Sequence, residues 1–93
     1  MRVLVIEDDV DLQRQLAATL GEAGYAVDQA HDGEEGEFLG QTESYDAVVL
    51  DLGLPKLDGL SVLRSWRDSD NNVPVLILTA RGSWTERVEG IDA

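Results

Sequence analysis

Carboxylates directly follow two apolar segments of this chain, and their placement is the first sign of chemistry. Asp51 ends an uncharged run and is soon followed by a glycine and a proline. The apolar residues 3–6 end in the same abrupt way, at the acidic residues Glu7, Asp8 and Asp9. A short apolar run that stops at such residues is typical of a buried strand, and open parallel sheets bind ligands at the carboxyl ends of their strands. We therefore expect these carboxylates to converge on one site.

Three interpretations of this acidic group are compatible with the residues. In the first, the carboxylates hold Mg²⁺, which prefers oxygen ligands, beside an aspartate that accepts a phosphoryl group as a nucleophile. In the second, two carboxylates carry out general acid–base catalysis as in glycosidases, although few aromatic residues are present to line a substrate groove. In the third, the acids only cap helices and face solvent. The third suits Asp9, which precedes a helical pattern, better than Asp51, which has no obvious helix to cap.

The elements that would position these carboxylates alternate between strand and helix patterns. Strands are predicted at residues 3–6, 25–30, 45–50 and 73–80. Helices are predicted to begin near Asp9, Asp32, Asp58 and Ser83. Gly36 and Gly40 should weaken the second helix, and the last helix would cover residues 83–91. This alternation, without repeats or linkers over 93 residues, predicts one α/β domain with a parallel sheet and crossover helices.

Composition excludes several classes of function. The chain has 19 acidic and 7 basic residues and a formal net charge of −12, which argues against direct contact with nucleic acid because phosphate contacts need clustered lysine and arginine. It has no cysteine, so disulfides and thiolate metal sites are excluded. No apolar run approaches the length of a transmembrane helix or of a signal-peptide core. We therefore expect a cytoplasmic protein without membrane contact.

Three segments together carry a resemblance to a known family. They are Val-Leu-Val-Ile-Glu-Asp-Asp at residues 3–9, Val-Val-Leu-Asp-Leu-Gly-Leu-Pro at 48–55 and Leu-Ile-Leu-Thr-Ala-Arg at 76–81. In order and spacing they resemble the receiver domain of two-component response regulators, over essentially the whole chain. Within that family the chain is most similar to the OmpR/PhoB subfamily and its PhoP-type members. The resemblance implies a flavodoxin-like (CheY-like) doubly wound parallel sheet with strand order 2-1-3-4-5.

The resemblance also implies roles for individual residues. Asp51 matches the phosphoacceptor of the family. Asp8 matches the acid that binds Mg²⁺ directly, and Glu7 matches its neighbour, which binds the ion through water. Gly53 matches the position whose backbone carbonyl is a further metal ligand. Thr79 matches the hydroxyl that turns toward the phosphoryl group and switches the domain.

The function implied by the resemblance is a phosphoacceptor switch rather than an enzyme, with at most self-phosphorylation and autodephosphorylation of its own. A sensor histidine kinase would supply the phosphoryl group, and a DNA-binding output domain outside this segment would control transcription. Arg87, Val88 and Ile91 match the helix-four part of the subfamily's homodimer face. Two alternatives are a receiver-like interaction module that is not phosphorylated and a small phosphatase of the aspartyl-phosphate type. The phosphatase class usually carries a second aspartate where Gly53 stands.

The chain departs from the family pattern at its C-terminal end. A complete receiver continues through a fifth strand with a Lys-Pro pair and then a fifth helix, and neither is found in these 93 residues. We therefore expect a receiver domain over residues 1–93 that is incomplete at its C-terminus, with no output domain. The fourth strand would then become an uncharged sheet edge without protection, which favours association between chains.

Overall fold

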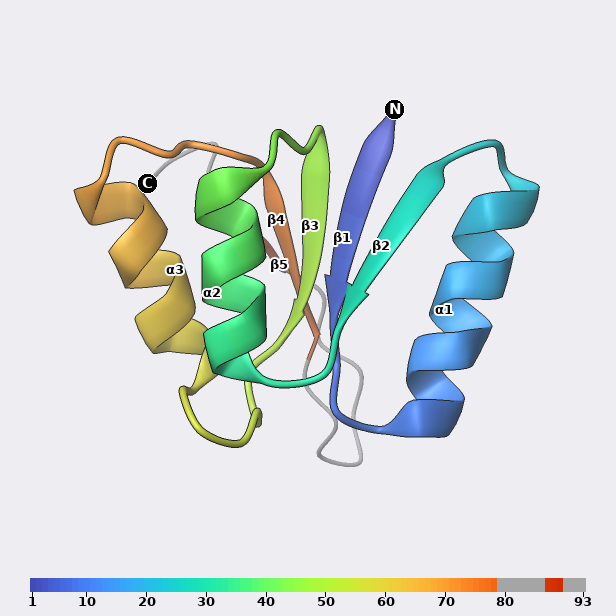
Figure 1. Cartoon of the computed structure of the whole chain (residues 1–93), viewed down its shortest axis with the longest axis horizontal. Coiled ribbons are helices and arrows are strands. Elements are labelled where there is room, and N and C mark those ends of the chain that lie inside the picture. Colours follow the sequence, from blue (N-terminus) through green and yellow to red (C-terminus); the bar gives the residue numbers. More distant parts are fainter. Residues whose placement is uncertain (79–86, 90–93) are drawn as a thin grey trace.

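A computed structural model of the chain describes residues 1–78 and, for the backbone alone, residues 87–89. Figure 1 shows strands and helices that alternate along the chain, as the sequence pattern predicts. The elements are β1 (Arg2–Ile6), α1 (Val10–Glu22), β2 (Ala26–Ala30), α2 (Gly33–Thr42), β3 (Ala47–Asp51), α3 (Gly59–Asp68), β4 (Val75–Leu78) and β5 (Arg87–Glu89). None of the helices in the described part of the chain is both long and apolar enough to span a membrane.

The strands form one sheet with the order β2-β1-β3-β4-β5. β1 to β4 are mutually parallel, so their carboxyl ends lie together at the bottom of the sheet in Figure 1. This end of the sheet is called the carboxyl edge below, and the end where the strands begin is called the amino edge. α1 covers one face of the sheet, and α2 and α3 cover the other (Figure 1). The predicted doubly wound parallel sheet and its strand order 2-1-3-4 are therefore confirmed.

The sheet differs from the sequence-based expectation at the edge beside β4. Arg87–Glu89 forms a short strand that pairs antiparallel with β4, in the register Ile77 to Arg87. The helix predicted over residues 83–91 is therefore wrong for 87–89, and so is the unpaired edge predicted for β4. The backbone groups along the edge of β4 gain hydrogen-bonding partners in this arrangement, whereas a short isolated helix is only marginally stable. The fifth position of the sheet is filled by an antiparallel segment rather than by the parallel strand of a complete receiver.

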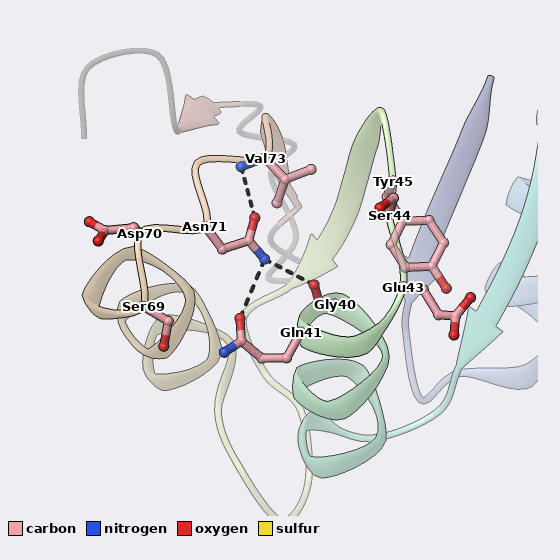
Figure 2. A pocket seen from close by; sticks show the side chains of 9 residues that line it. All are labelled: Gly40, Gln41, Glu43, Ser44, Tyr45, Ser69, Asp70, Asn71 and Val73. Atoms are coloured by element: carbon pink, nitrogen blue, oxygen red, sulfur yellow. Dashed lines mark hydrogen bonds between the residues drawn. The ribbon is translucent and has the colours of Figure 1, made fainter.

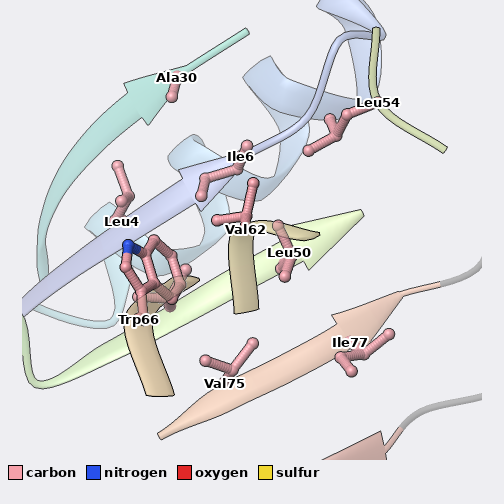
Figure 3. Packing of buried hydrophobic residues seen from close by; sticks show 10 residues of the cluster. Leu4, Ile6, Ala30, Leu50, Leu54, Val62, Trp66, Val75 and Ile77 are labelled. Carbon is pink, nitrogen blue, oxygen red and sulfur yellow. The ribbon is translucent and has the colours of Figure 1, made fainter. Parts of the chain in front are cut away.

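Two hydrophobic clusters hold the layers together, one on each face of the sheet. Because side chains alternate along a strand, Leu4 and Ile6 face one layer of helices while Val3 and Val5 face the other. The larger cluster lies on the face covered by α2 and α3, and Figure 3 shows Val62 and Trp66 of α3 against the strands. It contains Leu4, Ile6, Ala30, Val48, Leu50, Leu54, Val62, Trp66, Val75 and Ile77. The smaller cluster, packed against the leucines of α1, contains Val3, Val5, Val49 and Leu78.

The glycines of α2 contribute to packing, which the sequence pattern did not indicate. A side chain at Gly36 would collide with Ile6, and one at Gly40 would collide with the ring of Trp66. Trp66 is completely buried, and its indole nitrogen donates a hydrogen bond to the carbonyl of Glu37 at 3.2 Å. α2 can therefore approach the sheet and α3 closely because these two positions carry no side chain.

Candidate functional site

Three carboxylates meet at the carboxyl edge of the sheet. Glu7 and Asp8 follow β1, and Asp51 is the last residue of the neighbouring strand β3. One carboxylate oxygen from each lies within 4.8 Å of the others. Glu7 and Asp51 are only 3% and 5% exposed, whereas Asp8 is open to solvent. The parallel register of β1 and β3 thus brings residues 44 positions apart in the sequence into one cluster, hereafter the acidic site.

Backbone amides hold both buried carboxylates of the acidic site. The N–H of Asp9 donates to Oε2 of Glu7 at 2.9 Å, and the N–H of Gly53 donates to Oδ1 of Asp51 at 3.3 Å. Each carboxylate therefore has one oxygen oriented by the loop that follows its own strand. Asp9 itself caps α1, since its Oδ1 accepts from the amides of the second and third residues after it. The structural interpretation of Asp9 is confirmed.

The electrostatic balance of the acidic site is unfavourable for the carboxylates alone. Across residues 1–78, no lysine or arginine forms an ion pair with Glu7, Asp8 or Asp51. Burial, together with the neighbouring charges of Asp51 and Asp8, raises the pKa of Glu7 to about 7, although the amide of Asp9 opposes the shift. Glu7 is therefore about half protonated near pH 7, because burial and the neighbouring negative charges both disfavour its carboxylate form, and a bound cation would oppose this shift.

The donor set of the acidic site suits a small, hard divalent cation. All three side chains offer oxygen, which Mg²⁺ prefers to nitrogen or sulfur, and the exposed position of Asp8 leaves room for the waters that Mg²⁺ keeps. Gly53 lies beside Asp51, and a side chain added there would meet no atom within 4 Å. Packing therefore does not restrict which residue type stands at position 53, which agrees with a role for its backbone carbonyl rather than for a side chain. These residues fit Mg²⁺.

Other predicted residues are not placed at the site by the described structure. Thr79 follows Leu78, the register partner of Asp51, but lies outside the described residues. Arg87 and Val88 belong to β5 rather than to a helix, and their side chains are not described; Ile91 also lies outside the described part. The switch hydroxyl and the dimer face therefore remain predictions.

One residue near the acidic site was missed by sequence reasoning. Gln13, in the first turn of α1, is 1% exposed, and its amide nitrogen contacts the backbone carbonyls at the ends of β1 and β2. The available signal was its spacing, because Gln13 shares a helical face with Leu16 and Leu20. A polar residue on an apolar face of a helix indicates a buried hydrogen-bonding role.

A polar pocket of about 480 Å³ lies at the opposite edge of the sheet. Figure 2 shows it between the carboxyl-terminal ends of α2 and α3, where the amide of Asn71 donates to the carbonyl of Gly40 at 2.9 Å. It is lined by Gly40, Gln41, Glu43, Ser44, Tyr45, Ser69, Asp70, Asn71 and Val73. None of the three carboxylates of the acidic site lines it, so pocket and acidic site are separate features.

Comparisons with known proteins agree with this geometry. A family model described as the response regulator receiver domain matches residues 3–93. The transcriptional regulatory protein QseB of Haemophilus influenzae is 52% identical over the whole chain, and the transcriptional regulatory protein PhoP of Escherichia coli is 44% identical over the same span. In both cases the chain covers 42% of the relative's length.

Solved structures show the same fold. The receiver domain of the Francisella response regulator 1452 has a TM-score of 0.83 and 39% identity, covering 88% of this chain and 68% of that one. The response regulator TrrA of Thermotoga maritima, solved in complex with Mg²⁺ and BeF, has a TM-score of 0.81 and 33% identity, covering 87% and 70% of the two chains.

Proposed function

The chain belongs to the response regulator receiver domain family, and on that premise we propose that it is a phosphoacceptor switch phosphorylated on Asp51. The observation that carries the proposal is the convergence of Asp51 with Glu7 and Asp8 at the carboxyl edge of the sheet. Asp51 is the one carboxylate of this group that ends a strand buried on both faces. Glu7 and Asp8 lie in the loop after β1, whereas Asp51 belongs to β3 itself and is held directly by the sheet.

In the proposed reaction, a carboxylate oxygen of Asp51 attacks the phosphorus of a phosphohistidine or of a small acyl phosphate. A new P–O bond forms, and the P–N bond of the histidine or the P–O bond of the acyl phosphate breaks. The electron pair of the broken bond leaves with the imidazole or with the carboxylate of the donor. The amide of Gly53 orients Asp51 through Oδ1 during this step. Water later hydrolyses the aspartyl phosphate and resets the switch.

We assign Glu7, Asp8 and Asp51, with the backbone carbonyl of Gly53, as the groups that would hold Mg²⁺. When bound, the ion supplies positive charge that offsets the charge on the transferring phosphoryl group. The lack of an ion pair to these carboxylates within residues 1–78 supports the assignment, because nothing in that range already neutralises them.

The wider role is proposed from the relatives. QseB and PhoP are named as transcriptional regulators, and the chain covers 42% of each. We infer that a sensor histidine kinase in the cytoplasm phosphorylates Asp51 and that a DNA-binding part outside this chain controls transcription. Thr79 would carry the switch hydroxyl, and Arg87, Val88 and Ile91 would contribute to a homodimer face. The chain itself would act as a switch that turns over only its own aspartyl phosphate.

The test is incubation with acetyl phosphate and Mg²⁺ followed by intact-mass analysis. We expect one added phosphate in the wild type and none in Asp51→Asn, because the amide lacks the nucleophilic oxygen. Asp46→Asn is the matched control, since Asp46 lies just before the other end of β3 and accepts a hydrogen bond from the amide of Arg2 at 2.8 Å. Phosphorylation that persists in Asp51→Asn would reject the assignment, and a wild type that gains no phosphate would favour the interaction module.

A further inference from the structure

We propose that Gln13 is a positioning residue for the acidic site, fixing the end of β1 from which Glu7 and Asp8 project. The inference rests on the proposed function of that site. Gln13 lies on a different element from the three carboxylates and contacts none of their side-chain oxygens in the described structure. It would act through the backbone that carries two of them.

The contacts of Gln13 are concentrated on one corner of the sheet. Its Nε2 lies 3.1 Å from the carbonyl oxygen of Val5, 3.3 Å from that of Glu7 and 2.9 Å from that of Ala30. An amide has two N–H groups, so two donors are shared among three acceptors. The acceptors come from the carboxyl ends of two neighbouring strands, and one of them belongs to Glu7 itself. Gln13 therefore ties both strand ends to the first turn of α1.

The same corner is closed by backbone hydrogen bonds. The amide of Glu7 donates to the carbonyl of Ala30 at 3.0 Å, and the amide of Gln13 donates to the carbonyl of Asp9 at 2.9 Å. The amide of Asp9 in turn holds the carboxylate of Glu7. Gln13 is the buried side chain that connects this loop to the sheet. A shift of the Glu7 backbone would move both Glu7 and Asp8 relative to Asp51.

The surroundings of Gln13 indicate that packing alone does not explain why a polar residue stands at this position. Its Oε1 is buried and has no hydrogen-bond partner among the described residues. A buried polar atom without a partner lowers stability. An apolar residue on this face, beside Leu16 and Leu20, would avoid that loss but would give up the contacts of Nε2 with the strand ends. A polar group retained at a cost beside a cluster of charged side chains is typical of a functional site.

The test compares Mg²⁺ binding by calorimetry in the wild type and in Gln13→Met, which keeps a similar shape but has no donor. We expect the dissociation constant for Mg²⁺ to rise about tenfold, the effect usual for residues that support metal ligands. In the acetyl phosphate reaction, the half-saturating Mg²⁺ concentration should rise by the same factor. The rate at saturating Mg²⁺ should stay within about twofold of the wild type, because the loss is one of binding.

Asn71→Leu is the matched control for lost stability. Its amide also donates to a backbone carbonyl, that of Gly40, but at the opposite edge of the sheet. We expect it to lower the melting temperature and to leave Mg²⁺ binding within about twofold of the wild type. Gln13→Asn is a second variant that keeps an amide on a side chain too short to reach all three carbonyls; it should also weaken Mg²⁺ binding several-fold.

The outcomes separate this inference from the proposed function. Wild-type Mg²⁺ binding in either folded Gln13 variant, or an equal loss in Asn71→Leu, would overturn the inference and leave the assignment of Asp51 standing. Failure of both Gln13 variants to fold would make the residue structural and would also overturn it. A wild type that binds no Mg²⁺ would reject the metal site and the role of Gln13 together.

Discussion

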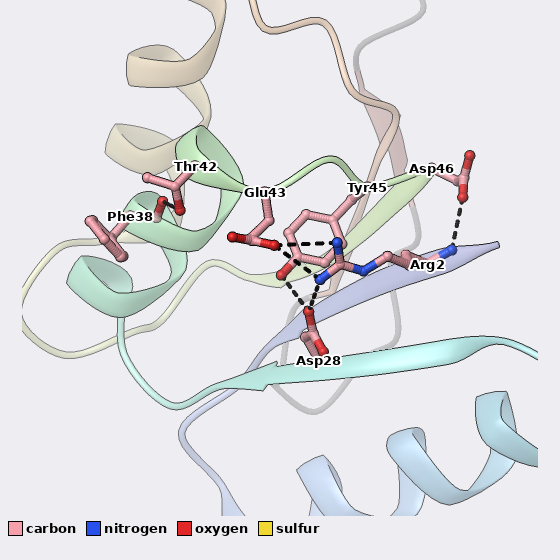
Figure 4. A network of polar contacts seen from close by, with 7 residues as sticks. All are labelled: Arg2, Asp28, Phe38, Thr42, Glu43, Tyr45 and Asp46. Atoms are coloured by element: carbon pink, nitrogen blue, oxygen red, sulfur yellow. Dashed lines mark hydrogen bonds and ion pairs between the residues drawn. The ribbon is translucent and has the colours of Figure 1, made fainter.

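The amino and carboxyl edges of the sheet each carry a group of acidic side chains, but within residues 1–78 only the group at the amino edge contains its own cation. At the amino edge, Arg2 pairs with Asp28 at 2.6 Å and with Glu43 at 3.3 Å (Figure 4). Tyr45 adds a hydrogen bond to Asp28 at 2.7 Å, and its ring centroid lies 4.9 Å from the guanidinium carbon of Arg2. At the carboxyl edge, no such cation pairs with the acidic site within residues 1–78.

The surroundings of the two acidic groups shift carboxyl pKa values in opposite directions. The hydroxyl of Tyr45 and the guanidinium of Arg2 lower the pKa of Asp28, which therefore stays ionised. Burial and the charges of Asp51 and Asp8 instead raise the pKa of Glu7 to about 7. A compensated acidic cluster stabilises the fold by itself, whereas an uncompensated and partly buried one is suited to binding an external cation. This difference, more than the number of acids, marks the carboxyl edge as the functional one.

The largest expected effect concerns the stability of the metal-free chain as a function of pH. Because the pKa of Glu7 rises from 4.5 to about 7 on folding, the folded chain keeps a proton that the unfolded chain has lost between these values. The free energy of unfolding should therefore fall as pH rises from about 4.5 to about 7, by up to about 3 kcal/mol.

Urea unfolding in the presence of a chelator, at a series of pH values, measures this change. Glu7→Gln should flatten the profile over the same interval, since the amide does not titrate. Glu43→Gln, at the amino edge, is the control and should leave the slope as it is. A profile that is equally steep in the wild type and in Glu7→Gln would show that the negative charge of the whole chain, rather than the acidic site, determines the pH dependence.

The second effect is stabilisation by the metal. Mg²⁺ that binds the folded chain alone raises the free energy of unfolding by RT ln(1 + [Mg²⁺]/Kd), about 1.4 kcal/mol at ten times the dissociation constant. Asp8→Ala should abolish this increase because it removes the exposed ligand of the acidic site. Asp28→Asn should keep it, since Asp28 pairs with Arg2 and is not one of the three carboxylates of the acidic site. Thermal melts with and without Mg²⁺ decide the matter: equal increases in all three proteins would mean that Mg²⁺ only screens charge.

The acidic site could be predicted from the sequence because its geometry follows from the fold class. Parallel strands end at one edge, so acids placed after residues 3–6 and after Leu50 must meet once the strands are neighbours. Asp9 was predicted as a helix cap for an equally local reason, and the structure confirms it.

Features that depend on packing between distant elements were not predicted. Gly40 was expected to weaken α2, but its lack of a side chain makes room for the ring of Trp66, which is 26 positions away in the sequence. The pairing of Arg87–Glu89 with β4 likewise depends on a sheet edge that becomes available only in the folded chain. The buried amide of Gln13 and the ion pairs of Arg2 join separate strands and helices, and no local pattern reports such contacts.

The smallest expected effect concerns the amino edge, where Arg2 compensates the acids, and it tests whether loss of that cation makes the two acidic groups alike. Arg2→Met leaves Asp28 and Glu43 without their shared cation and should lower the melting temperature slightly, because these ion pairs are partly exposed and screened by water. Mg²⁺ should stabilise the variant as much as the wild type, since the acidic site lies at the other edge. In Arg2→Met/Asp28→Asn the loss should be smaller than in Arg2→Met, because one carboxylate, Glu43, rather than two is left without its cation. If Arg2→Met instead creates a second site for Mg²⁺, detected as additional binding by calorimetry, the missing cation alone is sufficient to turn an acidic cluster of this fold into a metal site. If no new binding appears, burial and strand geometry at the carboxyl edge are needed as well, and this second result is the one we expect because Asp28 and Glu43 are 42% and 45% exposed.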